Sequence, residues 1–144
     1  MEIKIKRLNK NAVIPTRATE GSAGYDLYAC VDGPVTVEPQ QSFVFPTGIA
    51  IALSDGCAAF VYARSGLSVK FGLIPKNCVG VIDSDYRGEI RVCLHNLSDR
   101  AYTVNPGDRI AQMVIAPVLL PQLVETDELE NTERADGGFG SSGV

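Results

Sequence analysis

The chain has 144 residues, of which 45% are hydrophobic, and its formal net charge is −4. This length and hydrophobic content suit one domain with a substantial core. A field of negative sign does not attract nucleic acid or an anionic membrane surface, so we expect neither as a partner. An anionic ligand would have to be held by a few local groups instead.

The four cysteines are Cys30, Cys57, Cys78 and Cys93, and no two are spaced as CxxC. They are interpreted as buried free thiols of an intracellular, cytoplasmic protein, rather than as a disulfide framework or a zinc site. The N-terminal residues alternate between polar and apolar, which is typical of a strand and not of a signal peptide. No apolar run is long enough to cross a bilayer.

Short apolar or β-branched runs alternate with turn signals along the chain. They predict strands at residues 3–8, 35–38, 42–45, 48–53, 58–62, 79–82, 90–94, 102–104, 109–116 and 122–124, and the apolar segment around Asp26 also has the character of a strand. One brief helix is predicted at residues 66–71. This pattern predicts an all-β sandwich or barrel as the core, residues 1–124.

The composition changes at residue 125. Residues 125–133 are acidic and polar, and a glycine-rich stretch with a single phenylalanine follows. Such a segment cannot build its own core, so residues 125–144 are predicted to form a flexible C-terminal arm.

The stretch GVIDSDYRGE, residues 80–89, lies between two apolar runs and is predicted to be a β-hairpin with acids at its tip. Asp83 follows the first run directly, where a carboxylate can act as a general base or hold a metal-bound water. The Asn77 amide can donate and accept, which suits the edge of a base, although a turn role is the simpler interpretation. Tyr86 could face a sugar or could pack across strands.

Two further segments carry polar groups at the ends of apolar runs. Arg64, Ser65 and Gly66 precede the predicted helix, where they could bind an anion or provide an N-cap serine beside a surface arginine. Gln112 either points outward or meets a ligand. Asp108 and Arg109 are interpreted as local support for the turn, and Asp26 alone as more often a turn or hydrogen-bonding residue.

The C-terminal arm combines groups that suit a nucleotide. Glycine-rich backbone exposes N–H groups to phosphates, Arg134 adds positive charge, and Phe139 could stack on a base. The alternative is a disordered linker, which would have no use for a phenylalanine.

Taken in order, the five segments resemble the five motifs of the trimeric dUTPase family: AGYDLYA, ARSGLSVKFGL, GVIDSDYRGEI, GDRIAQMVI and RADGGFGSSG. The resemblance covers nearly the whole chain. It implies a β-jelly-roll subunit and a homotrimer with active sites at subunit interfaces. It also implies Mg²⁺-assisted hydrolysis of dUTP to dUMP and pyrophosphate, which keeps uracil out of DNA and supplies dUMP for thymidylate synthesis.

The resemblance also implies a role for each matching residue. Asp83 would activate the water that attacks the α-phosphorus, and Asp26 would meet Mg²⁺ through water. Tyr86 would pack under the deoxyribose. Uracil would be held by Asn77, Gly80, Val81, Ile82 and Arg91, mostly through backbone groups. Phosphates would be bound by Arg64, Ser65, Gly66 and Gln112, and the arm would close with Arg134, Phe139, Gly140 and Ser141.

The chain departs from the family pattern where Ala63 and Ala135 stand in place of the usual proline and glycine. Both are small, so we expect altered loop stiffness and not lost function. Two alternatives stay open. A dCTP deaminase shares the fold but needs its acid placed for attack at the base, and a non-catalytic trimeric module on the same scaffold would be expected to lack Asp83 or the arm.

Overall fold

The computed structural model describes residues 2–132 and 135–137. The elements are, in chain order, β1 (Lys4–Arg7), β2 (Tyr25–Tyr28), β3 (Val35–Val37), β4 (Ser42–Pro46), β5 (Ile49–Ala52), β6 (Cys57–Tyr62), α1 (Ser65–Phe71), β7 (Leu73–Pro75), β8 (Gly80–Ile82), β9 (Arg91–Asn96), β10 (Tyr102–Val104) and β11 (Arg109–Pro117). The predicted all-β fold with one short helix is therefore confirmed.

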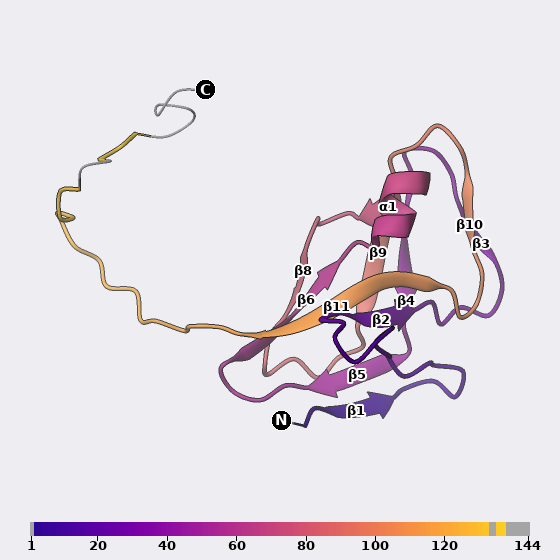
Figure 1. Cartoon of the computed structure of the whole chain (residues 1–144), viewed down its shortest axis with the longest axis horizontal. Helices are drawn as coiled ribbons and strands as arrows, with labels where there is room; N and C mark the ends of the chain where they lie inside the picture. Colours follow the sequence, from indigo (N-terminus) through magenta and orange to yellow (C-terminus); the bar gives the residue numbers. More distant parts are fainter. Residues whose placement is uncertain (1, 133–134, 138–144) are drawn as a thin grey trace.

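The two larger sheets have the strand orders β2-β11-β6-β8 and β4-β9-β7, and two-stranded pairs β1-β5 and β10-β3 flank them (Figure 1). All of these pairings are antiparallel. The long strand β11 pairs with both β2 and β6, so it aligns three of the four strands of this sheet.

The core lies between the two larger sheets and receives side chains from both of them. Leu27 and Ile110 come from the four-stranded sheet, whereas Phe45, Leu73 and Leu94 come from the three-stranded sheet, and all five are almost completely buried. Burial alternates along β9, as expected for a strand with one face on the core. The core therefore joins the two larger sheets.

The prediction of a hairpin between β8 and β9 is wrong. β8 pairs with β6, whereas β9 pairs with β4 and β7, so the two strands belong to different sheets. The Ile90 N–H donates to the oxygen of Ile49, the first residue of β5, at 2.9 Å just before β9 begins. Residues 83–90 are therefore a connection between sheets.

Two other predictions of strands need correction. β7 was missed because it has only three residues and ends in a proline, which gives too short an apolar run to indicate a strand. Residues 122–124 form no strand, and Leu123 and Val124 are 92% and 78% exposed. From residue 118 to 132 the chain runs away from the barrel without helix or strand (Figure 1).

Ala135 adopts a left-handed backbone conformation, with φ of 44°. Its N–H donates to the Thr132 oxygen at 3.1 Å. A Cβ makes this conformation unfavourable, which is the physical reason that a glycine suits the position.

All four cysteines are free thiols, but their burial differs from the prediction. Cys57 is buried, Cys30 and Cys93 are half-buried, and Cys78 is exposed, so the expectation of buried thiols is wrong for Cys78. Burial raises the pKa of the Cys30 thiol, and the negative charges of Glu89 and Asp32 raise it further. In the described part of the chain, no helix has the length and apolar character needed to cross a membrane.

Candidate active site

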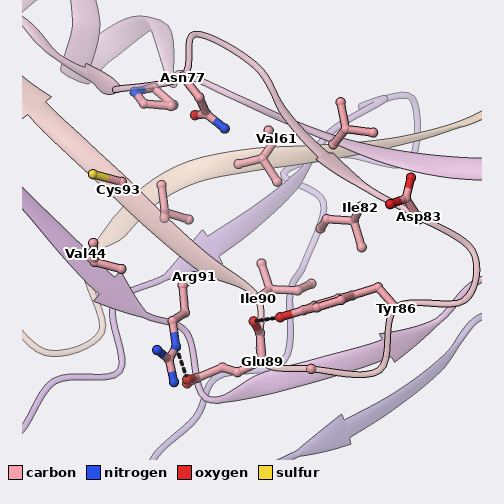
Figure 2. A pocket seen from close by; sticks show the side chains of 15 residues that line it. Val44, Val61, Asn77, Ile82, Asp83, Tyr86, Glu89, Ile90, Arg91 and Cys93 are labelled. Carbon is pink, nitrogen blue, oxygen red and sulfur yellow. Dashed lines mark hydrogen bonds and ion pairs between the residues drawn. The ribbon is translucent and has the colours of Figure 1, made fainter.

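A cavity of 610 Å³ lies where β8 and β9 diverge into their separate sheets (Figure 2). Its walls include seven of the residues singled out from the sequence, namely Asn77, Gly80, Val81, Ile82, Asp83, Tyr86 and Arg91. The sequence placed these residues near one another in a hairpin, and the structure instead gathers them at the edge between two sheets.

The Asn77 amide projects over this cavity from a tight turn (Figure 2). The turn is closed by the Val79 N–H, which donates to the backbone oxygen of Asn77 at 2.6 Å. Between these two residues, Cys78 adopts a φ of 62°. A Cβ at Gly80 would lie 3.2 Å from the Val61 Cβ and 3.5 Å from the Asn77 Nδ2. The absence of a side chain at Gly80 therefore keeps its backbone accessible from the cavity beside a donor and acceptor amide.

The Tyr86 ring folds back over Gly88. A Cβ at Gly88 would lie 2.4 Å from the Tyr86 hydroxyl oxygen, and that hydroxyl donates to the Glu89 backbone oxygen at 2.9 Å. The ring remains 45% exposed and lines the cavity. The Tyr86 ring is therefore held at its hydroxyl end, and its face remains available to a ligand.

The Asp83 carboxylate lies at the rim of the same cavity, directly after the last residue of β8 (Figure 2). It is exposed, and within residues 2–132 and 135–137 it has no hydrogen-bond or ion-pair partner. A carboxylate that is free of competing donors can accept a proton from a water placed beside it.

A second cavity, of 420 Å³, contains the other polar residues predicted for the barrel. Asp26 on β2, Gln112 on β11 and Tyr62 on β6 occupy directly opposed positions, so they form one row across three strands. Arg64, Ser65 and Gly66 reach the cavity from the start of α1. The row exists because the antiparallel register aligns residues that are far apart in the sequence.

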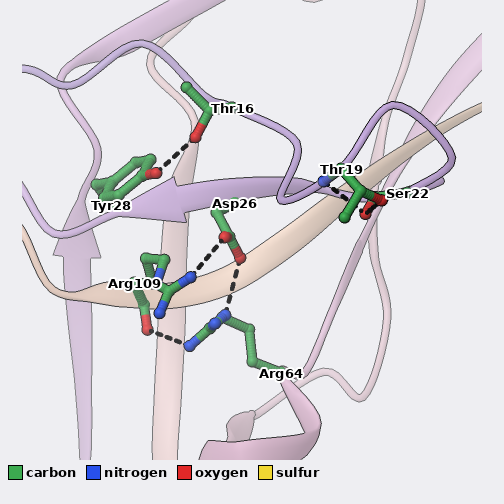
Figure 3. A network of polar contacts seen from close by, with 7 residues as sticks. All are labelled: Thr16, Thr19, Ser22, Asp26, Tyr28, Arg64 and Arg109. Atoms are coloured by element: carbon green, nitrogen blue, oxygen red, sulfur yellow. Dashed lines mark hydrogen bonds and ion pairs between the residues drawn. The ribbon is translucent and has the colours of Figure 1, made fainter.

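Asp26 joins two arginines in this cavity (Figure 3). Its Oδ1 accepts from the Arg64 Nε at 2.8 Å, and its Oδ2 accepts from the Arg109 Nη1 at 3.3 Å. The side chain of Asp26 is 14% exposed, whereas that of Arg109 is 50% exposed. Two guanidinium groups and one carboxylate leave a net positive charge, which suits an anion.

Arg109 is the site residue that sequence reasoning missed. It was interpreted as a local support for its turn, yet its partner Asp26 is 83 residues away in the sequence. Ser65 was considered as an N-cap, but the N-cap is Arg64 and no side chain caps the helix. Ser65 and Gly66 are therefore in the first turn, where backbone N–H groups have no acceptor within the helix.

Gln112 points into this cavity and is held in place at its amide. Its Nε2 donates to the Ala63 oxygen at 2.9 Å, and a Cβ at Gly24 would lie 2.6 Å from its Oε1. The glycine in AGYDLYA therefore provides the space that Gln112 needs. Ala63 contributes a backbone acceptor, which it can do as well as the proline usual in the family.

The two cavities share no lining residue and lie on opposite faces of the four-stranded sheet. Val61 and Ile82 face inward and are buried, whereas the next residue of β6, Tyr62, faces outward with Gln112. Successive residues of a strand point to opposite faces. One chain therefore presents two separate cavities. Arg134, Phe139, Gly140 and Ser141 lie outside the described residues.

The sequence model of the dUTPase family matches residues 10–143. A protein of Idiomarina loihiensis named deoxyuridine 5'-triphosphate nucleotidohydrolase is 49% identical, and the match covers 99% of this chain and 97% of that protein. A protein of the same name from Neorickettsia sennetsu is 52% identical, with 94% and 91% of the two chains covered.

Solved structures agree with these matches. The dUTPase of Staphylococcus bacteriophage 80alpha, with dUPNHPP, has a TM-score of 0.91 and 32% identity, and 99% of each chain is covered. A mutant dUTPase from phage phi11 of S. aureus, described with a structural Mg(II) ion, has a TM-score of 0.81 and 28% identity, with 91% of this chain and all of that chain covered. The chain belongs to the dUTPase family.

Proposed function

We propose that this protein hydrolyses dUTP to dUMP and pyrophosphate. The observation that carries the proposal, within a chain of this family, is the free Asp83 carboxylate at the rim of a cavity that also contains the Asn77 amide and the Tyr86 ring. Groups for base recognition, sugar contact and proton transfer are thereby brought together around one cavity.

Uracil recognition would use the backbone of β8 and the Asn77 amide. Uracil presents acceptor, donor and acceptor groups along its pairing edge. β8 is the edge strand of its sheet, so backbone groups of Gly80, Val81 and Ile82, with that of Arg91, can supply the complementary groups. Cytosine would leave buried polar groups unpaired, which is strongly penalised. The 610 Å³ cavity is of a size suited to a nucleoside.

Asp83 would act as the general base. It would take a proton from a water, the water oxygen would bond to the α-phosphorus, and the bond from that phosphorus to the oxygen bridging to the β-phosphate would break. The electron pair leaves with pyrophosphate, and dUMP remains. Because Asp83 directly follows β8, the strand that holds the base also fixes the position of its carboxylate.

The phosphates would be bound by Arg64, Ser65, Gly66 and Gln112, and we add Arg109 to this set because its exposed guanidinium lines the same cavity. These groups would neutralise charge on the substrate and hold the phosphate chain for in-line attack. Because Asp26 bonds Arg64 and Arg109 at opposite oxygens, it fixes the orientation of both cations.

Mg²⁺ is the implied cofactor, and Asp26 fits it through a bridging water. Asp26 is the only acid among the described residues that line the second cavity, and each carboxylate oxygen keeps a lone pair after its bond to an arginine. Magnesium usually keeps several waters and binds substrate phosphates through few protein groups. Bound there, Mg²⁺ would supply charge neutralisation on the triphosphate.

We also propose that the active unit is a homotrimer with shared sites. The support is the separation of the base cavity from the phosphate cavity on opposite faces of one sheet, because a single nucleotide needs both. A neighbouring subunit would bring its phosphate cavity to the base cavity. We propose residues 1–124 as the core and residues 125–144 as the arm that closes over a neighbouring site, with Arg134, Phe139, Gly140 and Ser141 on the nucleotide.

The proposed activity is tested by pyrophosphate release from dUTP, with dCTP, dTTP and UTP in parallel and with or without Mg²⁺. We expect Mg²⁺-dependent release from dUTP alone. Ammonia from dCTP would instead indicate the deaminase. Tight binding of dUTP without any release would indicate a non-catalytic module.

Gly88→Ala tests the role of Tyr86 against the sugar. The new Cβ would overlap the Tyr86 hydroxyl, and the flexible side chain can rotate away, so we expect little change in stability but a displaced ring. The preference for dUTP over UTP, measured as a ratio of kcat/KM values, should fall roughly tenfold. Gly21→Ala is the matched control, since a Cβ there meets nothing within 4 Å. An unchanged ratio would exclude Tyr86 from sugar selection.

A further inference from the structure

Residues 83–89 carry Asp83 and Tyr86, and they have few hydrogen bonds to the rest of the molecule. Arg87 donates to the Ser84 and Tyr86 oxygens, and the Tyr86 N–H donates to the Asp83 oxygen, so these contacts stay within the segment. Throughout the described ranges, only one hydrogen bond connects residues 83–89 to a distant part of the sequence. It joins the Glu89 carboxylate to the Gly48 N–H at 2.9 Å.

Glu89 makes three contacts, of which those with Arg91 and Tyr86 lie at the base cavity (Figure 2). Its Oε1 accepts from the Gly48 N–H, and its Oε2 accepts from the Arg91 Nε at 2.8 Å. Its backbone oxygen accepts from the Tyr86 hydroxyl at 2.9 Å. The Glu89 side chain is 19% exposed, whereas the Arg91 side chain is 64% exposed, so Glu89 is the more fixed member of the ion pair.

Gly48 is a rigid attachment point for Glu89. It is buried in the turn between β4 and β5 and adopts a φ of 67°, which favours glycine. A Cβ there would lie 2.8 Å from both the Ala12 Cβ and the Cys30 Sγ. Its oxygen accepts from the Leu8 N–H at 2.7 Å. Because Gly48 is enclosed on these sides, the bond from its N–H fixes the position of Glu89.

We propose that Glu89 is a positioning residue for nucleoside selection, which rests on the proposed dUTPase function. Through its carboxylate it attaches the segment to Gly48 and orients Arg91. Through the placement of its backbone oxygen it sets where the Tyr86 hydroxyl is held. Asp83 is fixed separately, because it follows β8, whose residues pair with β6. Glu89 therefore acts on recognition of sugar and base more than on the chemical step.

Glu89→Gln tests whether Glu89 acts on nucleoside recognition and not on the chemical step. The glutamine amide keeps an oxygen that can accept from the Gly48 N–H. Its NH₂ group then faces the Arg91 guanidinium, so two donors oppose each other and the ion pair is lost. We expect the KM for dUTP to rise about tenfold and the preference for dUTP over UTP to fall by a similar factor, with kcat within roughly threefold of the unsubstituted protein. Glu38→Gln is the matched control, since Glu38 is exposed and its carboxylate has no partner in the described part of the chain.

Arg91→Met breaks the same ion pair from its exposed end and guards against a folding defect in the first variant. It should shift the dUTP preference in the same direction, and the double variant should shift it no further than the larger single change. If both single variants keep the original preference and KM, the inference is wrong, even where the melting temperature of Glu89→Gln falls. If the unsubstituted protein itself releases no pyrophosphate from dUTP, the proposed function fails instead.

Discussion

Asp83→Asn should bind dUTP normally and lose most of its turnover. The asparagine keeps the size of the side chain but cannot accept a proton from the attacking water, and general base catalysis typically contributes about 10²–10⁴-fold. The carboxylate is exposed and has no polar partner among the described residues, so its replacement should leave folding intact. Pyrophosphate release measures kcat, and calorimetric titration with a non-hydrolysable dUTP analogue measures affinity.

Asp85→Asn is the matched control for this substitution. It removes the same charge from the same segment at an exposed position that does not line the base cavity. We expect its kcat to stay close to that of the unsubstituted protein. Near-normal turnover in Asp83→Asn would exclude Asp83 as the base, and equal losses in both variants would indicate a general effect of charge in the segment.

Removal of residues 134–144 should abolish most activity without unfolding the protein. Among the described residues, the buried core extends from Ala12 to Met113, and residues 135–137 are not part of it. Base–aromatic stacking alone is worth about 1–3 kcal/mol, and lost phosphate contacts add to that, so kcat/KM should fall on the order of 100-fold. The melting temperature, followed by circular dichroism, should change by only a few degrees.

Phe139→Ala in the full-length chain separates stacking from the other roles of the arm. Its loss should be smaller than that of the deletion, because Arg134 and the glycine-rich backbone remain. A sharp fall in melting temperature after deletion would contradict this assignment, since the arm would then be chiefly a brace between subunits.

The elements of this fold were predictable where one strand face is buried. Apolar runs in the sequence identified β6, β9 and β11, because each run reports the environment of its own segment. The partner of a strand is not encoded in that pattern. Hence β8 and β9 could be placed correctly in the sequence and still be paired wrongly.

The candidate site was likewise predictable from local sequence only in part. Asn77, Asp83 and Tyr86 are close in the sequence, so a single turn-rich segment predicted their common cavity. Arg109 and Glu89 could not be found this way, because their roles depend on Asp26 and Gly48, which are 83 and 41 residues away. Such pairs are set by sheet register and by where the chain crosses between sheets.

The placement of the base cavity and the phosphate cavity on opposite faces of one sheet has a genetic consequence. Under the proposed assembly, each site combines the base cavity of one subunit with the phosphate cavity of another. A mutation at Asp83 therefore damages the base half of one site, and a mutation at Arg64 damages the phosphate half of another. Two inactive variant chains expressed together would form mixed trimers in which some sites receive both intact halves. Alleles of this gene would thus complement one another within a single protein, according to which face of the sheet each mutation alters.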